Sequence, residues 1–287
     1  MHLWGSDLLT LSITAWYKMK RSVPFCLWLP SLVRNFMTKP RILVTNDDGI
    51  HARELKLLAA ALDEVGEVWV FAPDRQQSAV SHGVSLHRPL RVHQVKDRWF
   101  MVDGTPADCV MLAVRDLMGE RPVLVVSGIN PGANLGDDVT YSGTVAGAYE
   151  GMLLGIPSFA ISDVHYTPKH PETAATFAAK LALRLIECGM PADTVLNVNV
   201  PDVTYEEVAG VSITRMGRRR YHDEIIRRED PRGGVYYWIG GAAPSHIVEE
   251  GTDFEAIGNR RISITPLGRN LTNDAAIGIL RNAGIKL

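Results

Sequence analysis

The chain has 287 residues, 46% of them hydrophobic, which is enough for one large α/β domain with a sizeable core. Its formal net charge is −2 and its isoelectric point is about 6.5, so it lacks the positive field of a dedicated nucleic-acid-binding protein. The three cysteines, at positions 26, 109 and 188, match no zinc-ligand spacing, and this usage favours a reducing, cytoplasmic compartment.

The first 38 residues differ in character from the rest of the chain. The apolar runs Leu8–Trp16 and Val23–Val33 are both shorter than the roughly 20 residues of a membrane span, and no basic segment precedes the first as in a signal peptide. We therefore expect residues 1–38 to be a disordered or non-native extension without membrane contact, with Met37 as the more natural start. Residues 39–287 are predicted to form a single α/β domain. Its core spans about 39–205, and an oligomerisation arm with closing strands spans about 206–287.

From Arg41 onward, apolar runs typical of strands alternate with helical patterns. The expected strands are Arg41–Thr45, Val68–Ala72, Pro122–Val126, Pro157–Ile161 and Val195–Val200. Four helices are expected between these strands. The first carries Leu55, Leu58, Ala59 and Leu62 on one face, and the second begins at Thr105-Pro106-Ala107-Asp108 and ends near Met118. The third runs from about Thr144 to Leu154, and the fourth spans Glu172–Cys188. This alternation predicts a doubly wound, Rossmann-like, mostly parallel sheet with helices on both faces.

After Pro201 the pattern changes. The strand-like runs Val211–Arg215, Val235–Ile239 and Arg261–Thr265 follow one another without long helices between them. We expect them to form a C-terminal antiparallel extension with a protruding hairpin arm that joins subunits into an oligomer.

Polar loops follow three of the expected parallel strands. They are Asn46–Gly49, Asp74–His82 and Ser127–Gly136. Because ligands of an open α/β sheet bind beyond the carboxyl ends of the strands, these loops are where we expect the functional site.

The first loop contains the adjacent carboxylates Asp47 and Asp48, which repel each other unless a cation neutralises them. The hydroxyl of Ser78 and the amide oxygen of Asn130 are the further candidate ligands in the other two loops. An all-oxygen set of this kind favours Mg²⁺, Mn²⁺ or Ca²⁺ over structural zinc. The alternative is that the two aspartates only cap the next helix and form a turn with Gly49.

The segment Tyr141–Ala148 (YSGTVAGA) places hydroxyl residues and glycine at a helix start, where exposed N–H groups and the helix dipole favour a phosphate. An ordinary capped helix that packs through small residues explains the same pattern equally well. A cation beside an anion site indicates phosphoryl chemistry. Asn134 and the Gly132–Gly136 backbone are then placed to hold the phosphate oxygens.

Two further features allow more than one interpretation. His82, in the second loop, is a candidate acid or base, although a lone loop histidine is more often incidental. The arginine-rich run at 215–220, with Arg227 and Arg228, is better explained by a solvated hairpin or a subunit contact than by binding of a polyanion.

Several segments together resemble the SurE family, the survival-protein 5'/3'-nucleotidases. In family order they are RILVTNDDGIHARELKLLAAAL, APDRQQSAVSHGVSL, VDGTPADCV, VSGINPGANLGDDVTYSGTVAGAYEG and RISITPL. They run from about Arg41 to beyond Leu267. The segment Met1–Thr38 is a departure, because the family pattern does not require it.

The resemblance implies a metal-dependent phosphatase that hydrolyses nucleoside 5'- and 3'-monophosphates, with some activity on short polyphosphate. It implies one divalent cation per subunit, Mg²⁺ or Mn²⁺, and a cytoplasmic homodimer or homotetramer joined through C-terminal arms. The implied metal ligands are Asp47, Asp48, Ser78 and Asn130, of which the two aspartates are also the catalytic residues. The implied phosphate contacts are Asn134, Ser142, Gly143 and Thr144.

Three alternatives stay open at this point. Hydrolysis by direct attack of water competes with a covalent route through an aspartyl-phosphate on Asp47. A receiver-like Mg²⁺-binding signalling domain also carries an acidic pair after its first strand, but it needs a phosphoacceptor aspartate at the end of the third strand, where this chain has Ser127–Asn130. A metal-dependent hydrolase of another ester class would use the same residues.

Overall fold

The computed structural model describes residues 39–247 and 249–283, with the backbone alone at 221–223 and 241–244. The expectation of a disordered or non-native extension at 1–38 lies outside the described residues. The strands are β1 (Arg41–Thr45), β2 (Glu67–Pro73), β3 (Val92–Lys96), β4 (Trp99–Val102), β5 (Leu124–Pro131), β6 (Ser158–Asp163), β7 (Thr194–Val200), β8 (Val211–Ile213), β9 (Arg219–Glu229), β10 (Val235–His246) and β11 (Ile262–Gly268). The helices are α2 (Arg53–Asp63), α3 (Pro106–Leu112), α4 (Gly143–Leu153), α5 (Pro171–Cys188), α6 (Asp253–Gly258) and α7 (Asp274–Asn282).

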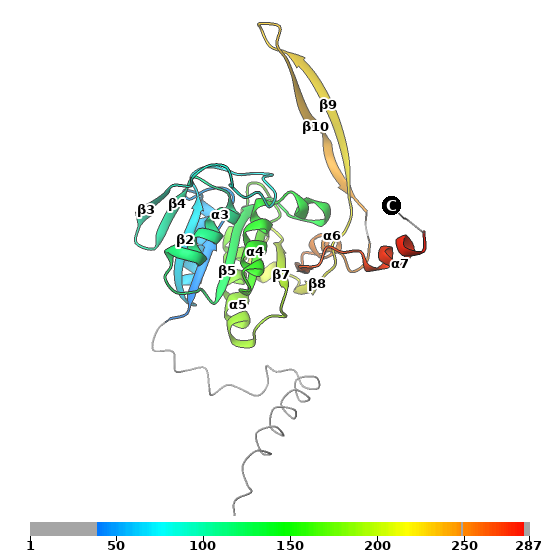
Figure 1. Ribbon diagram of the computed structural model, residues 1–287. Coiled ribbons are helices and arrows are strands. Elements are labelled where there is room, and N and C mark those ends of the chain that lie inside the picture. The colour runs from blue at the N-terminus through cyan, green and yellow to red at the C-terminus, as the bar shows by residue number, and fades with distance from the viewer. Residues whose placement is uncertain (1–38, 248, 284–287) are drawn as a thin grey trace, which may run out of the picture.

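Nine of these strands form one sheet in the order β3-β4-β2-β1-β5-β6-β7-β11-β8, and β9 and β10 form a separate hairpin that projects from the body (Figure 1). The strands from β4 to β7 in this order run parallel, whereas β3 pairs with β4, and β11 with β7, in antiparallel fashion. The predicted doubly wound, mostly parallel sheet with an antiparallel C-terminal extension is confirmed for β11 and for the β9–β10 hairpin. The exception is β8, which was expected in the same antiparallel extension but pairs with β11 in parallel fashion. No helix among the described residues is long and apolar enough to cross a membrane.

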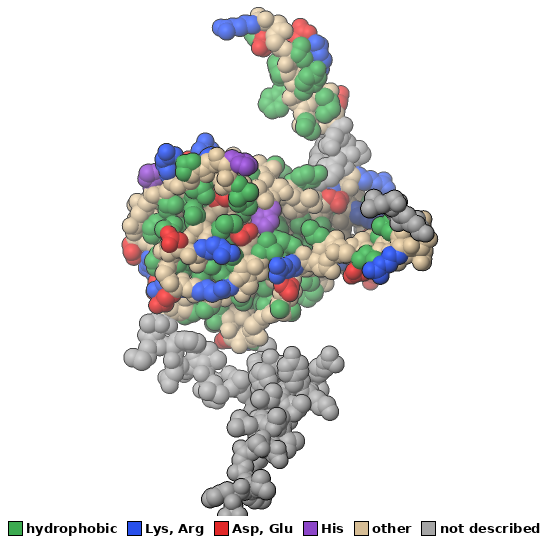
Figure 2. All heavy atoms as spheres, in the orientation of Figure 1, with side chains coloured by type: hydrophobic (Ala, Val, Ile, Leu, Met, Phe, Trp, Pro, Cys, Tyr) green, Lys and Arg blue, Asp and Glu red, His purple; other side chains and the backbone are tan. Residues whose placement is uncertain are grey.

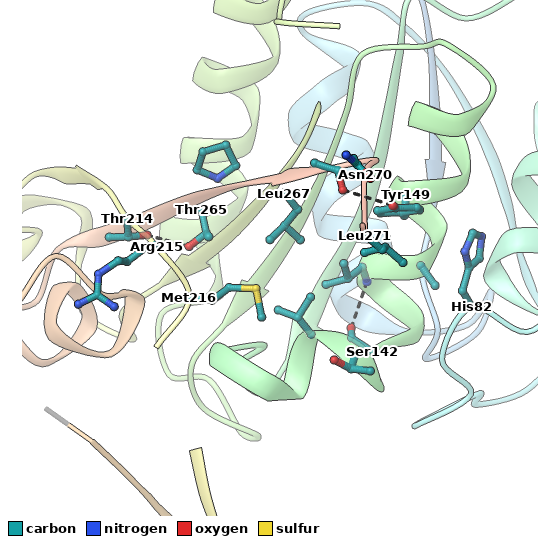
Figure 3. Close-up of a pocket in the computed structure, with 16 residues that line it drawn as sticks. His82, Ser142, Tyr149, Thr214, Arg215, Met216, Thr265, Leu267, Asn270 and Leu271 are labelled. Carbon is teal, nitrogen blue, oxygen red and sulfur yellow. Dashed lines mark hydrogen bonds between the residues drawn. The ribbon is translucent and has the colours of Figure 1, made fainter. Parts of the chain in front are cut away.

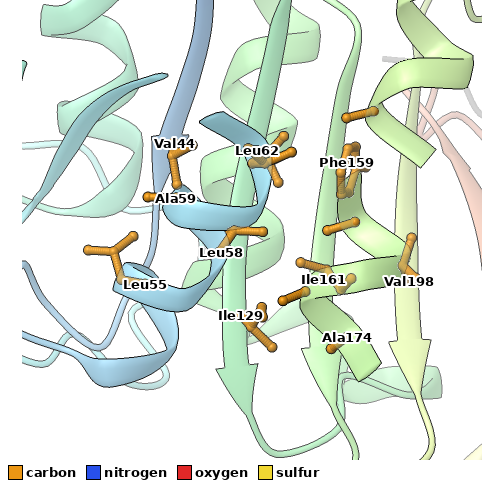
Figure 4. Packing of buried hydrophobic residues seen from close by; sticks show 14 of the residues in the cluster. Val44, Leu55, Leu58, Ala59, Leu62, Ile129, Phe159, Ile161, Ala174 and Val198 are labelled. Atoms are coloured by element: carbon orange, nitrogen blue, oxygen red, sulfur yellow. The ribbon is translucent and has the colours of Figure 1, made fainter. Parts of the chain in front are cut away.

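Helices cover both faces of the sheet. On one face α2 packs beside α5, and Leu55, Leu58 and Leu62 are fully buried against the sheet, as their spacing predicts (Figure 4). Each such leucine contributes roughly 1.5–3 kcal/mol of transfer free energy. On the other face α3 and α4 pack side by side over smaller clusters. This sandwich fixes the strand ends, and therefore the loops that follow them.

Helix α4 lies unusually close to the sheet because its inner face carries glycine. A Cβ on Gly147 would stand 2.9 Å from both the Ser127 hydroxyl and the Thr45 methyl, and a Cβ on Gly151 would collide with Ser158 and Val125. Packing through small residues, one of the two interpretations of this segment, is therefore present. As a result the start of α4 reaches the carboxyl edge of the sheet.

The structure changes several of the predicted boundaries, among them the end of α3 and the end of β5. The capping box at Thr105 and Asp108 forms as expected, but α3 ends at Leu112 and continues as a π-helical turn to Leu117. Strand β5 does not stop at Val126. It pairs with β6 as far as Pro131, so that Asn130 lies within the strand end rather than in a loop. The polar composition of its last residues hid this extension.

Candidate active site

The strand-end loops converge on a cavity of about 640 Å³ at the carboxyl edge of the sheet. Of the eight residues implied as metal ligands or phosphate contacts, six line this cavity: Asp47, Asp48, Ser78, Asn130, Asn134 and Ser142. Gly143 and Thr144 lie directly behind Asp47. The fold thus brings together side chains that lie up to 97 positions apart in the chain.

The turn after β1 is built by Asn46 and not by the aspartates. The Asn46 amide donates to the Gly49 carbonyl and accepts from the Gly49 N–H, both at 3.2 Å, and Gly49 has a φ of +97°, which favours glycine. Helix α2 begins later, behind Ala52, which makes no side-chain cap. The alternative that Asp47 and Asp48 cap this helix is therefore wrong, and both carboxylates are available to the cavity.

Asp47 is buried at the positive end of α4. Its carboxylate accepts a hydrogen bond from the Thr144 hydroxyl, and a Cβ on Gly143 would stand 2.9 Å from its Cβ and Oδ2. Burial raises the pKa of Asp47, and the hydrogen bonds from Thr144 oppose that rise. The helix start, for which phosphate binding was one of two equal interpretations, therefore stabilises the charge on Asp47.

Asp48 is the electrostatically unfavourable member of the pair. Burial, followed by the charges of Asp47 and Glu54, raises the pKa of Asp48 to about 7. Its Oδ2 is buried and has no hydrogen-bond partner among the described residues. A buried carboxylate oxygen without a donor is costly, and a divalent cation would satisfy it.

The donor set fits a hard cation. Ser78 is held near the pair because the neighbouring Gln77 N–H donates to the Asp47 carbonyl at 2.7 Å. The Asn130 amide donates through Nδ2 to the Gly132 carbonyl at 2.6 Å, which keeps its Oδ1 for a cation. Nowhere in residues 39–247 or 249–283 do three or more His, Cys, Asp or Glu side chains gather in a metal-binding group. The set offered here is instead two carboxylates with a hydroxyl and an amide, which suits Mg²⁺ or Mn²⁺.

Asn134 is fixed by a buried polar network that sequence reasoning missed. Its N–H donates to Asn199 Oδ1 at 2.8 Å, and its carbonyl accepts from Asn197 and Asn199 at 2.8 and 3.0 Å. Its side-chain amide donates to the Ser162 hydroxyl at 2.7 Å. The two asparagines within the apolar strand β7 were the available signal, since buried polar side chains require partners. They hold the loop after β5 rigidly against the sheet.

Arg219, at the foot of the hairpin, also lines the cavity. The arginine run that contains it was expected to be a solvated hairpin or a subunit contact, and no local signal separated Arg219 from its neighbours. Arg218 and Arg220 are exposed, whereas the Arg219 side chain is only 15% exposed.

His82 lies in a different place from the acidic pair. It lines a neighbouring cavity of about 710 Å³, where Figure 3 shows it on one side with Thr214 and Met216 on the other. Its Nε2 lies 2.9 Å from Glu150 Oε2. Ser142 borders both cavities. His82 does not line the cavity that holds Asp47 and Asp48, so an acid or base role there finds no geometric support.

Comparison with known proteins gives a consistent result. Residues 42–223 match the family model described as survival protein SurE. The chain is 52% identical over 242 residues to the 5'-nucleotidase SurE of Geobacter sulfurreducens, covering 84% of this chain and 92% of that protein. It is 50% identical over 240 residues to the 5'-nucleotidase SurE of Pelobacter propionicus, covering 83% and 97%. The crystal structure of the SurE protein from Aquifex aeolicus superposes with a TM-score of 0.75 at 40% identity, over 86% of this chain and 100% of that one.

Proposed function

The chain belongs to the SurE family, and we propose on this basis that it is a metal-dependent phosphatase that hydrolyses nucleoside 5'-monophosphates to nucleoside and phosphate. We extend the proposal to 3'-monophosphates and to short polyphosphate, whose terminal phosphates present the same dianionic group. A receiver-like signalling domain is set aside, because the family match covers 182 residues from 42 to 223.

The observation that carries the proposal is the Asp47–Asp48 pair at the start of α4. One carboxylate has an unpartnered buried oxygen, and the other lies against the helix N-terminus. We propose Asp47, Asp48, Ser78 and Asn130 as the ligands of one Mg²⁺ or Mn²⁺ ion per subunit. Bound there, the ion supplies Lewis-acid chemistry that offsets the charge on the phosphoryl oxygens.

The chain's own residues supply binding and orientation. The Ser142 hydroxyl accepts from the Val145 N–H at 3.1 Å and caps α4, and its neighbours Gly143 and Thr144 stand at the positive end of that helix. We propose that this end and the rigid loop at Asn134 bind the phosphoryl oxygens. Thr144 also orients Asp47. Water is the proposed nucleophile. In the alternative route the phosphoryl group is transferred first to Asp47, and trapping with labelled substrate would detect that phosphorylated aspartate.

We further propose that the enzyme is a cytoplasmic homodimer or homotetramer joined through the β9–β10 hairpin. The upper part of this arm carries apolar side chains beside charged ones (Figure 2), and among the apolar ones Ile225, Tyr237, Trp238 and Ile239 are 61–80% exposed. Large exposed apolar surfaces of this kind are typical of protein–protein contacts. Light scattering of the intact protein before and after deletion of residues 221–244 tests this assembly.

Phosphate release from a panel of phosphate esters tests the activity. The panel contains nucleoside 5'- and 3'-monophosphates, tripolyphosphate and a carboxylic ester, each with Mg²⁺, Mn²⁺ or EDTA. We expect turnover of the nucleotides with either ion and none with EDTA. Turnover that survives chelation would contradict the metal dependence, and hydrolysis of the carboxylic ester alone would assign another ester class.

A further inference from the structure

Arg219 brings a positive charge into a cavity whose other charged groups are acidic. The charged side chains among the described residues of the lining are Asp47, Asp48, Asp138 and Arg219. A phosphate monoester at neutral pH carries a charge of about −1.5 to −2, so three carboxylates would repel it. Among the described residues that line the cavity, Arg219 is the one with a positive charge to attract the phosphate.

The guanidinium is held in a fixed orientation. Its Nε donates to Asp138 Oδ2 at 2.6 Å, and its Nη2 forms an ion pair with the same oxygen. The main-chain N–H of Arg219 donates to Asp137 Oδ2 at 2.9 Å, and the guanidinium carbon lies 5.3 Å from the centre of the Phe254 ring. Asp138 thus engages one edge of the planar group, and Nη1 has no acceptor among the described residues.

The Arg219 side chain lies at the cavity, whereas those of Arg218 and Arg220 are exposed to solvent. A solvated hairpin would not require this difference. Arg218 precedes β9, and Arg219 and Arg220 are its first two residues. Of these three arginines, only Arg219 lines the cavity. A guanidinium presents a planar row of N–H donors that matches phosphate oxygens, and an acidic partner that fixes the group lowers the ordering cost of binding.

We propose that Arg219 is a phosphate-binding residue of this site, donating from Nη1 to the phosphoryl oxygens of the substrate while Asp138 fixes its orientation. The inference rests on the proposed function for the identity of the substrate, although phosphate binding itself can be measured separately. Because Arg219 is the first residue of β9, the hairpin arm and the substrate site share a side chain. The competing role is a structural latch in which the Arg219–Asp138 pair only holds the arm against the body.

The test compares Arg219→Gln and Arg219→Lys with the control Arg218→Gln, whose exposed side chain does not line the cavity. Steady-state rates with a nucleoside 5'-monophosphate at saturating Mg²⁺ give KM and kcat. Titration calorimetry with inorganic phosphate and Mg²⁺ gives an affinity that needs no turnover. Melting temperature and light scattering report fold and assembly for each variant.

For Arg219→Gln we expect the KM of the nucleotide and the Kd of inorganic phosphate to rise together by roughly ten- to hundredfold, the loss of a hydrogen bond to a charged group. The Mg²⁺ concentration for half-maximal activity should stay unchanged. Arg219→Lys should recover part of both losses, because it keeps the charge without the planar fork. Arg218→Gln should stay within about twofold of the wild type for both quantities, as expected of an exposed residue.

Wild-type phosphate affinity in Arg219→Gln would overturn the proposal. An altered melting temperature or assembly state in both Arg219 variants, with unchanged phosphate affinity in the folded fraction, would assign the latch role instead. If the wild-type protein released no phosphate from any nucleotide, the proposed function would fail, but the calorimetric comparison would still decide whether Arg219 binds phosphate.

Discussion

Without a cation, ionised Asp48 should destabilise the folded protein, and Asp48→Asn should relieve this. The folded-state pKa of Asp48 is raised from 3.8 to about 7, so the native state holds its proton more tightly than the unfolded chain does. Protonated Asp48 therefore contributes to the free energy of unfolding. This contribution is fully present below about pH 4 and is lost as the pH rises towards 7 and the group ionises. Replacing the carboxylate by a neutral amide removes that loss.

The magnitude follows from the raised pKa. One pKa unit corresponds to about 1.4 kcal/mol, so the full rise corresponds to about 4 kcal/mol. Because Asp48 is partly exposed, solvent screening reduces this to about 1–2 kcal/mol. For a domain of this size, that raises Tm by roughly 3–6 °C.

Thermal melting in EDTA between about pH 5 and pH 8 tests this prediction. The Tm of Asp48→Asn should exceed that of the wild type, with a gap that widens up to about pH 7 and then stays constant. The exposed carboxylate Asp63 provides the matched control, since Asp63→Asn should show no such trend. Addition of Mg²⁺ at pH 8 should raise the Tm of the wild type and leave that of Asp48→Asn unchanged. A gap that does not vary with pH, or a less stable Asp48→Asn at pH 8 in EDTA, would refute the reasoning.

Three further variants probe the neighbourhood of the pair. Gly143→Ala should abolish most activity, because its Cβ would stand 2.9 Å from the Asp47 carboxylate, whereas Gly278→Ala meets nothing within 4 Å and should keep wild-type rates in the same phosphate-release assay. Thr144→Val removes the hydroxyl that donates to Asp47 and should raise the Mg²⁺ concentration for half-maximal activity by roughly tenfold, whereas Thr144→Ser should stay close to the wild type; equal Mg²⁺ dependence in both would argue against this role. His82→Ala should keep kcat within about threefold, because His82 lines the neighbouring cavity, and a loss of several orders of magnitude would restore it as an acid or base.

Much of the fold was predictable because buried parallel strands are short apolar runs, and those at Arg41–Thr45 and Val195–Val200 illustrate this. The hairpin β3–β4 was missed because β3 is an exposed edge strand with mostly polar residues. Strand β9 was missed for the same reason, since charged residues fill most of it. A strand is recognised from its sequence when its side chains are buried and therefore apolar. The described side chains of β3 and β9 are mostly exposed, so their composition gives no such signal.

The part of the site that lies in the loops at the strand ends was predictable from the sequence. Adjacent carboxylates after β1 indicate a cation from their charge alone. The contact between Thr144 and Asp47 was not predictable, because it depends on how closely α4 approaches the sheet. Arg219 was not predictable either, since the hairpin must return to a loop that lies 81 positions earlier in the chain.

The most direct test of the central claim is a metal titration of the chelator-stripped enzyme, followed by phosphate release from a nucleoside 5'-monophosphate. We predict that activity returns with Mg²⁺ or Mn²⁺ and saturates at one ion per subunit, and that neither Asp47→Asn nor Asp48→Asn regains activity at matched concentrations. Full activity in the stripped wild-type enzyme, or full recovery in Asp48→Asn with wild-type metal affinity, would contradict the assignment of this pair as the metal site.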